Sequence, residues 1–206
     1  MKALIVVDLQ YDFVPPDGKL AVPGGAELPE KISNLCEALK KKGFLIVGTQ
    51  DWHPRNHGSF ASTHSKPPFT MGELSGAPQM LWPDHCVQES KGAELDSLVK
   101  GHLEKVIQKG TNPAVDSYSG FFDNNKNGDT GLNDYLQANN IKKVYVCGLA
   151  LDYCVKFTCL DAVALHYDTN LITDLCRAVT VQGGIDALKE LKLKKVKLVD
   201  SKELLK

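Results

Sequence analysis

The sequence predicts an α/β fold: a single-domain, three-layer α/β/α architecture with a mostly parallel, doubly wound, six-stranded sheet. Two observations predict it. Short apolar runs rich in Val and Ile alternate with longer segments whose apolar residues recur at helical spacing, and this alternation is typical of a parallel sheet covered by helices. The chain of 206 residues shows no internal repeat and no linker, so we expect one domain over residues 1–206.

The expected elements follow in chain order. Short runs dominated by β-branched and apolar residues predict strands at Ala3–Val7, Phe44–Thr49, Glu104–Gln108, Lys143–Cys147, Asn170–Thr173 and Val196–Val199. Apolar residues three and four positions apart predict helices at Ala26–Lys42, Ala93–Lys100, Gly131–Asn139, Asp152–His166 and Thr180–Leu191. Two regions are irregular. Residues 52–91 form a long connection rich in Pro and His, of a length that is usually functional, and residues 118–130 predict an exposed loop.

Composition excludes several kinds of partner. Lys and Arg number 24 against 25 Asp and Glu, so no basic surplus exists to bind a phosphate backbone, and we expect no nucleic-acid partner. No apolar run reaches membrane length, and the first one is too short for a signal peptide, so we expect a cytoplasmic protein without a membrane partner. The six cysteines form no CxxC pair and predict buried free thiols. A homo-oligomer is left open.

Reactive side chains follow several of the predicted strands. Asp8 follows the first, Asp51 and His53 follow the second, and Lys109 follows the third. The fourth runs on to Cys154, at the start of the next predicted helix. Because parallel strands direct their carboxyl ends to one edge of a sheet, where ligands bind, we expect these residues to converge there.

Cys154 is the candidate nucleophile. Asp152 is a natural N-cap residue, which places Cys154 in the first helical turn, where the helix dipole favours a thiolate. Lys109 can lower the pKa of the thiol further, and Asp8 can accept its proton and later return it to a leaving amine. On spacing alone a plainer interpretation stays open: Cys154 packs against the sheet, and the two acids only cap a helix and end a strand.

Asp51, His53 and His85 are candidate metal ligands. Residues two apart at a strand end point to the same side, so Asp51 and His53 can share one ion. Two imidazoles and a carboxylate suit Zn²⁺, Fe²⁺ or Mn²⁺, with positions left for water or substrate. Taken alone, the Asp-x-His pattern is also compatible with an incidental pairing. His57 and His64 could also be ligands, but we expect them to be surface residues of the loop.

Long segments of the chain resemble the nicotinamidase branch of the isochorismatase-like hydrolases. They are VVDLQYDFVPPDGKLAVPGG at Val6–Gly25, TQDWHPRNHGSFAS at Thr49–Ser62, LWPDHCVQES at Leu81–Ser90, QKGTNPAVDSYSGFFDN at Gln108–Asn124 and VCGLALDYCVKFTCLDA at Val146–Ala162. The resemblance covers nearly the whole chain, and the order of the segments makes it far more specific than any one motif. It implies a catalytic triad of Asp8, Lys109 and Cys154.

The same resemblance implies the substrate and the rest of the site. It implies hydrolysis of nicotinamide to nicotinate and ammonia through a cysteine thioester. One divalent ion, Zn²⁺ before Fe²⁺ or Mn²⁺, would bind at Asp51, His53 and His85 and hold the pyridine nitrogen. The backbone N–H groups of Ala150 and Cys154 would form the oxyanion hole, beside a cis Leu149–Ala150 peptide. Aromatic residues would line the ring pocket, namely Phe13, Trp82, Tyr118 and Tyr153.

Two alternatives are weighed against this hypothesis. A related cysteine amidohydrolase of the same fold could act on a carbamoyl or ureido substrate, but many such relatives lack the metal-binding residues. A nucleotide-binding module would need a glycine-rich turn after the first strand, where this chain has Asp8–Asp12. Leu151 departs from the family pattern, because the cysteine segment of relatives commonly reads Ala-Thr-Asp and has a threonine at this position.

Overall fold

The structure is a computed structural model that describes all 206 residues, Met1–Lys206. Its main sheet has six strands in the order β5-β2-β1-β6-β7-β8, and every pair of neighbours is parallel. The strands are β1 (Lys2–Val7), β2 (Leu45–Asp51), β5 (Lys105–Lys109), β6 (Lys143–Leu149), β7 (Asp168–Arg177) and β8 (Lys197–Val199). The predicted α/β fold with a parallel six-stranded sheet is confirmed.

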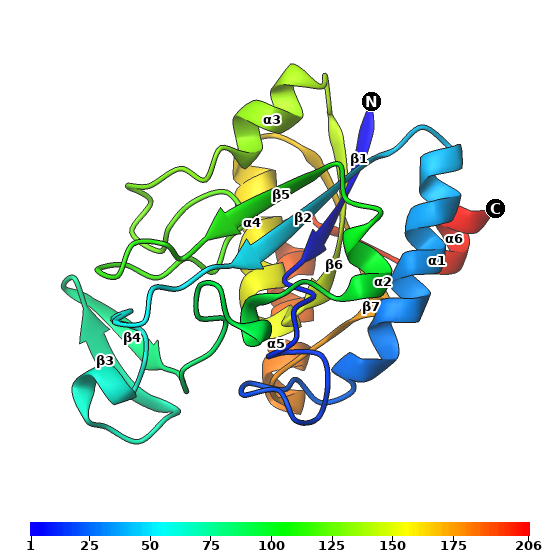
Figure 1. Ribbon diagram of the computed structural model, residues 1–206. Coiled ribbons are helices and arrows are strands. Elements are labelled where there is room, and N and C mark those ends of the chain that lie inside the picture. Colours follow the sequence, from blue (N-terminus) through cyan, green and yellow to red (C-terminus); the bar gives the residue numbers. More distant parts are fainter.

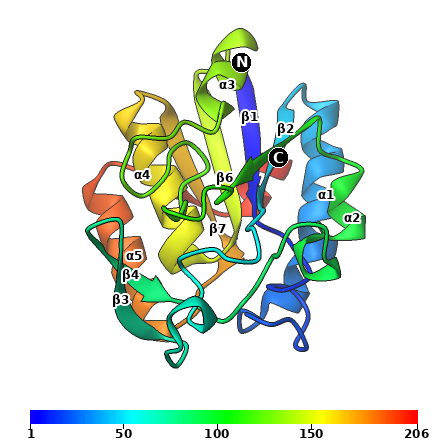
Figure 2. The same ribbon diagram turned by 60° about the vertical axis from the view of Figure 1, so that its left-hand side comes forward.

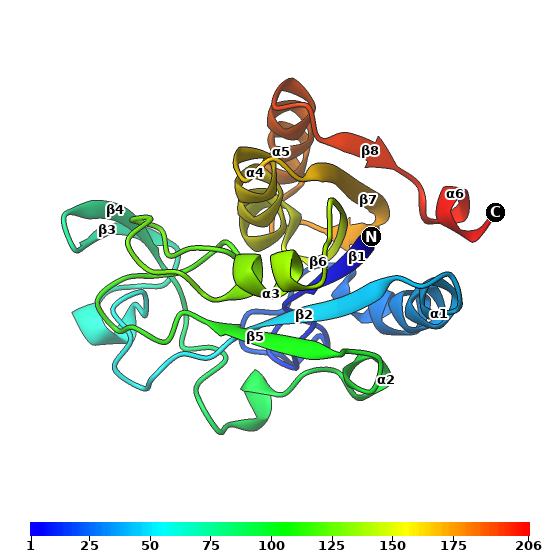
Figure 3. The ribbon, with the colours of Figure 1, turned by 90° about the horizontal axis from the view of Figure 1, so that it is seen from above.

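Helices cover both faces of this sheet. One face carries α1 (Leu28–Lys41), α2 (Ser97–Lys100) and α6 (Ser201–Leu205), and the other carries α3 (Leu132–Ala138), α4 (Lys156–Ala164) and α5 (Val181–Leu193) (Figures 1 and 3). Short helical turns lie at η1 (Gly25–Glu27), η2 (Ser62–His64), η3 (Lys91–Ala93) and η4 (Leu151–Val155). In the central strand β1, residues 3–7 are all buried, which is why this run is continuously apolar rather than alternating.

The strand order reverses direction between β1 and β6. From β1 the chain proceeds to β2 and β5 on one side of the sheet, and later through β6 to β7 and β8 on the other. A crevice forms at such a switch point, at the carboxyl ends of the two strands, because the connections leave in opposite directions. The fold therefore places the residues after β1 and β6, Asp8 and Cys154 among them, at the expected ligand site.

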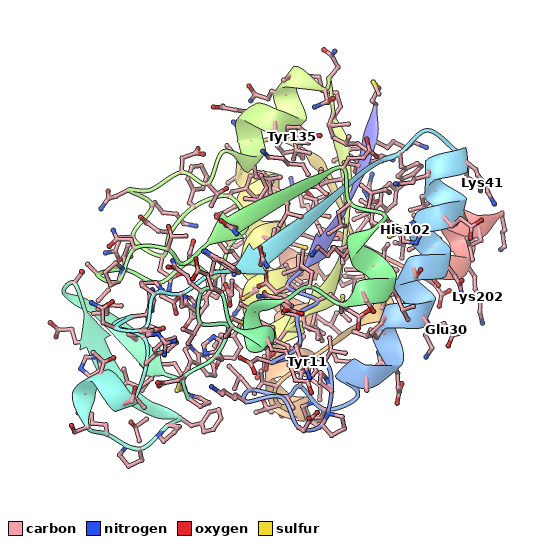
Figure 4. All side chains as sticks on the ribbon, viewed as in Figure 1. Tyr11, Glu30, Lys41, His102, Tyr135 and Lys202 are labelled. Carbon is pink, nitrogen blue, oxygen red and sulfur yellow. The ribbon has the colours of Figure 1, made fainter.

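Some predicted boundaries are wrong. The segment predicted as one helix over Ala93–Lys100 holds only the short helix α2, which begins after Asp96, whose carboxylate accepts the N–H of Leu98 at 2.9 Å. Helix α6 was not predicted, although Asp200 and Glu203 form a capping box at its start. His102 lies beside α1 (Figure 4), with Nε2 2.9 Å from the Ser33 hydroxyl.

The long connection after β2 contains a hairpin that was also not predicted. Strands β3 (Thr70–Leu74) and β4 (Ala77–Leu81) pair antiparallel, apart from the main sheet (Figures 1 and 2). Its two turn residues, Ser75 and Gly76, have φ values of 51° and 78°, as a type I′ turn requires. Gly72 and Pro78 hide the strand pattern, because both residue types are rare in strand interiors.

Two compositional expectations can be compared with the structure. All six cysteines are free and buried, as predicted. None of the helices combines the length and the hydropathy that crossing a membrane would require.

Candidate active site

Cys154 lies where β6 passes into α4, in the π-helical turn η4. The N–H of Val155 donates to the carbonyl of Ala150, five residues back, at 3.1 Å, which is the hydrogen bond that defines a π turn. Single π turns are frequent at functional sites. Cys154 is 7% exposed and lines a pocket, so its thiol is enclosed by protein on most sides yet open to a ligand.

Asp152 does not cap this turn, so that expectation was wrong. The N-cap position belongs to Ala150, and no side chain caps it. The Asp152 carboxylate instead accepts hydrogen bonds from the N–H groups of Val179 at 2.9 Å and Thr180 at 3.2 Å. Because these donors immediately precede α5, Asp152 ties the turn of the cysteine to the start of that helix.

The residues before Asp152 explain the departure from the family pattern. The Leu149–Ala150 peptide is cis, as the resemblance implied, and Ala150 lines the same pocket as the cysteine. Leu151 is buried, lies beside Gly184 of α5 and is absent from the pocket lining. Leu151 therefore packs behind the turn, and its difference from a hydroxyl residue does not reach the pocket.

Lys109 connects the acids with the thiol. Its ammonium lies 2.9 Å from a carboxylate oxygen of Asp8 and 2.5 Å from one of Asp51. It also donates to the carbonyl of Ser117 at 2.8 Å and lies 3.5 Å from the sulfur of Cys154. Burial lowers the pKa of Lys109, but the charges of Asp51 and Asp8 outweigh it and hold that pKa well above its usual value. Lys109 is thus a buried cation whose partners are all in place.

Asp8 is a fully buried acid directly after β1. One of its oxygens accepts the hydroxyl proton of Thr49 at 2.6 Å, and the Asp8 N–H donates back to that hydroxyl at 3.2 Å. Burial raises the pKa of Asp8 to about 6, although the Lys109 cation lowers it in part. The carboxyl group is therefore ionised at neutral pH and holds a pKa suited to a general base.

The surroundings of Cys154 favour the neutral thiol over the thiolate. Burial raises its pKa well above the usual value, the Lys109 cation lowers it in part, and the Asp8 carboxylate raises it again. The pKa of this thiol was expected to be lowered, and the direction is the opposite, because a helix terminus and one ammonium do not outweigh burial beside two carboxylates. The thiol requires a base, and the ligand atoms of Asp8, Asp51 and Cys154 all lie within 4.8 Å of one another.

Asp51, His53 and His85 converge as predicted. The Nε2 atoms of His53 and His85 lie 3.6 and 3.8 Å from the same oxygen of Asp51. Each ring is oriented through its other nitrogen, with Nδ1 of His53 2.8 Å from the carbonyl of Gly110 and Nδ1 of His85 2.7 Å from that of Pro83. Backbone carbonyls orient metal-binding histidines in this way. Two imidazoles and a carboxylate fit a divalent metal ion of borderline softness, so this group supports a divalent metal as the cofactor.

His57 and Asp116 form a second group with His53, and Asp116 was not predicted from the sequence. His57 was expected at the surface, yet it is fully buried, because the turn from Pro54 directs it inward, where its ring lies 4.3 Å from that of His53. Its Nδ1 lies 2.7 Å from the Ser59 hydroxyl, while Nε2 has no partner. Burial lowers the pKa of His57 to about 4, and that of His85 likewise. Both rings are therefore neutral, and Nδ1 of His57 also accepts the backbone N–H of Ser59 at 3.2 Å. His64, which is half-buried, bonds to a loop carbonyl instead.

Gln10 is a second missed residue. Its side-chain amide accepts the N–H of Asp51 at 2.8 Å and donates to the Asp51 carbonyl at 2.8 Å. The same amide nitrogen donates to the carbonyl of Ala93 at 2.9 Å. Gln10 thereby replaces the ladder hydrogen bonds that β1 no longer supplies and fixes the backbone of a metal-binding residue. The available signal was a polar amide three residues after a buried strand end.

One pocket joins the cysteine to the metal-binding group. Cys154 and Ala150 line it together with Asp51, His53 and His85. Its remaining walls are mostly apolar and are formed by Phe13, Leu20, Val22, Trp82, Asp116, Tyr118, Tyr153 and Val179. The ring of Trp82 meets that of Tyr153 edge to face at 4.8 Å between centroids, and its indole N–H donates to the Tyr118 hydroxyl at 3.1 Å. Every residue predicted for the site lies at this pocket or within contact of its lining.

The fold and this pocket are those of an amidohydrolase. The chain belongs to the isochorismatase family, whose isochorismatase domain matches residues 2–203. It is similar to the nicotinamidase of Escherichia coli strain K12, with 50% identity over 182 residues, which cover 88% of this chain and 85% of that protein.

Two solved structures are similar along almost the whole chain. One is the yeast nicotinamidase bound to the inhibitor nicotinaldehyde, with a TM-score of 0.91, 35% identity, and 97% of this chain and 100% of that chain covered. The other is the pyrazinamidase of Pyrococcus horikoshii in complex with zinc, with a TM-score of 0.81, 38% identity, and 97% and 98% covered. The resemblance inferred from the sequence is confirmed.

Proposed function

We infer that this protein hydrolyses nicotinamide to nicotinate and ammonia. The observation that carries the inference is one pocket in which a buried thiol, flanked by an acid and a lysine, faces a metal-binding group across aromatic walls. A flat heteroaromatic amide matches this layout, because one end of the pocket can bind a ring nitrogen while the other attacks a carboxamide. The names of its close relatives agree with this assignment.

The first chemical step uses Asp8, Lys109 and Cys154. Asp8 accepts the thiol proton of Cys154, and the sulfur forms a bond to the carboxamide carbon. Lys109 remains an ammonium throughout and stabilises the negative charge that moves between the carboxylate and the sulfur. We propose that the backbone N–H groups of Ala150 and Cys154 hold the oxyanion of the tetrahedral intermediate.

The second half of the reaction reuses the same acid. Asp8 returns its proton to the departing nitrogen, and the C–N bond breaks. Ammonia is released, and the acyl group remains bound to Cys154 as a thioester. A water molecule then loses a proton to Asp8 and adds to the thioester carbon. The C–S bond breaks and Asp8 returns the proton to the sulfur, which regenerates the thiol and releases nicotinic acid, which ionises to nicotinate at neutral pH.

Asp51, His53 and His85 would hold the metal ion. When bound, the ion supplies a Lewis acid for the pyridine nitrogen and so orients the ring. We propose Zn²⁺ as this ion, which the zinc complex of the similar pyrazinamidase supports, with Fe²⁺ and Mn²⁺ as competitors for the same donors. Phe13, Trp82, Tyr118 and Tyr153 would pack against the ring and exclude water from the thioester.

An ammonia-release assay on the purified protein tests this function. We expect ammonia and nicotinate in equal amounts from nicotinamide, loss of activity after chelation, and recovery when Zn²⁺ is restored. Carbamoyl and ureido compounds should release little ammonia. Hydrolysis of those compounds in place of nicotinamide would overturn the assignment and favour the related amidohydrolase.

Two broader proposals accompany this one. We propose that residues 1–206 form a single domain, which the family match over residues 2–203 supports. The cytoplasmic location expected from the composition stays a prediction, as does the absence of nucleic-acid and membrane partners.

A further inference from the structure

A second cavity lies directly behind one wall of the catalytic pocket. Its volume is about 220 Å³. It is bounded by the hairpin, by the loop after β5 and by α4, through residues that include Leu74, Pro78, Asn124 and Phe157. Asp116 and Tyr118 line both this cavity and the catalytic pocket, so they form the partition between the two spaces.

Tyr118 is the larger part of this partition, and it is firmly held. Its hydroxyl accepts hydrogen bonds from the side-chain amide of Gln79 at 3.0 Å and from the indole of Trp82 at 3.1 Å. Its ring stacks on that of Phe157 with 5.5 Å between centroids. Because side chains from the hairpin end and from α4 fix the phenol, it acts as a rigid wall and not as a mobile lid.

Gln79 anchors both members of the partition. It is 4% exposed, and the nitrogen that reaches Tyr118 also donates to the Asp116 carboxylate at 3.0 Å. Gln79 belongs to β4, so the hairpin contributes to the pocket through a side chain that never touches it. The size of the catalytic pocket on this side is thus set by a hydrogen-bonded unit of Gln79, Trp82 and Tyr118.

We propose that Tyr118 is the specificity-determining residue that restricts the substrate to a single-ring amide. This inference rests on the proposed function. With Tyr118 in place, a second ring fused to the pyridine meets the phenol. Without the phenol, the catalytic pocket opens into the cavity behind it, whose lining includes the apolar side chains Leu74, Pro78 and Phe157. The bonds that form and break at Cys154 are the same for a wider amide, and the accepted width of the substrate increases.

Two bicyclic amides probe the partition from different edges of the pyridine ring. Quinoline-3-carboxamide carries a benzene ring on the pyridine edge beside the nitrogen, and isoquinoline-4-carboxamide carries it on the edge beside the carboxamide. Both keep the ring nitrogen and the carboxamide in the relative positions that nicotinamide has. The measured quantity is kcat/KM for each bicyclic amide divided by kcat/KM for nicotinamide.

For Tyr118→Ala we expect this ratio to rise about 10- to 100-fold for at least one bicyclic amide, and for Tyr118→Leu to rise less. Tyr118→Phe keeps the wall and should leave the ratio unchanged. Tyr153→Ala is the matched control, because Tyr153 lines the catalytic pocket but not the cavity. An equal rise in Tyr153→Ala, or no rise in either Tyr118→Ala or Tyr118→Leu, would overturn the proposal.

A binding measurement keeps the proposal testable if Tyr118→Ala loses turnover. The Kd values of a bicyclic amide and of nicotinamide can be measured by calorimetry in a Cys154→Ala background. Removal of the Tyr118 ring should lower the ratio of the Kd of the bicyclic amide to that of nicotinamide. An unchanged ratio of the two Kd values contradicts the proposal. Wild-type protein that releases no ammonia from nicotinamide would contradict the proposed function instead, so the two failures are distinguishable.

Discussion

The edge of the sheet and the pocket wall opposite it are built in different ways. Asp8, Asp51 and Lys109 each stand at the end of a parallel strand, and short contacts between charged groups hold them together. Trp82 and Tyr118 lie on long connections and are held by hydrogen bonds between neutral groups. The edge therefore positions the reacting groups, whereas the wall sets the shape of what reaches them. Substitutions in the two regions should act on different kinetic constants.

The largest effect should come from Lys109. In Lys109→Met the carboxylates of Asp8 and Asp51 lose their shared cation while buried, which should cost about 3–5 kcal/mol of unfolding free energy. We expect kcat/KM to fall about 10³-fold or more. Lys105→Met is the matched control, because Lys105 is exposed on the same strand and should change neither quantity. Ammonia-release kinetics and urea unfolding measure the two quantities. A kcat/KM of Lys109→Met within tenfold of the wild-type value contradicts the role assigned to the edge.

Gln10 should have the next largest effect, on metal binding. Gln10→Leu leaves the N–H and the carbonyl of Asp51 without their side-chain partners, so the carboxylate loses its fixed position. Removal of such supporting groups typically weakens metal affinity about 10- to 100-fold. Zinc titration against a competing chelator measures the change. Gln137→Leu, on the exposed face of α3, is the control and should bind zinc normally; equal affinities for the two variants would sink the positioning role.

The pH profile tests Asp8. Burial raises its pKa to about 6, and only the ionised form accepts the thiol proton, so kcat/KM should fall about tenfold per pH unit below pH 6. The raised pKa of Asp8 also affects the free energy of unfolding, but its contribution falls as pH rises, whereas activity increases. A raised pKa means that the folded state binds the proton more tightly, so this contribution is present at low pH and is lost as pH rises through about 6. As pH rises from 4 to 7, the free energy of unfolding of Asp8→Asn should therefore increase relative to that of the wild type. A difference in unfolding free energy that stays constant over this range contradicts the raised pKa.

The smallest effect should come from Trp82. Trp82→Phe removes the indole N–H that donates to the Tyr118 hydroxyl but keeps an aromatic wall. The loss of one hydrogen bond of about 0.5–1.5 kcal/mol predicts a 2- to 10-fold rise in KM with little change in kcat. Steady-state kinetics on nicotinamide give both constants. A fall in kcat with KM unchanged would place Trp82 with the reacting groups and remove the distinction between edge and wall.

The edge of the sheet was predictable from the sequence, and the reason is geometric. In a parallel sheet the residue after each strand is directed to a common edge. The positions of the apolar runs therefore predict that Asp8, Asp51 and Lys109 lie at that edge. The ion pairs among them were not predictable in detail. Nor was the raised pKa of Cys154, since it depends on burial and on two carboxylates brought in from other strands.

The wall was predictable only through the resemblance to a family. The hairpin that carries Gln79 contains Gly72 and Pro78, which weaken any strand pattern, and His57 lies in a loop whose direction depends on tertiary packing. Asp152 illustrates the same limit, because its carboxylate accepts hydrogen bonds from two N–H groups just before α5, and no local sequence pattern reveals these partners. Local rules fail where distant segments supply the partners.

The central claim is that Cys154 carries the acyl group of the substrate. Acid quenching of the wild-type protein during turnover of nicotinamide, followed by mass spectrometry of its peptides, tests it most directly. We predict a mass increase of one nicotinoyl group on the peptide that contains Cys154, and neither this adduct nor ammonia release in Cys154→Ala. A nicotinoyl group on another residue, or near-wild-type ammonia release by Cys154→Ala, would contradict the account.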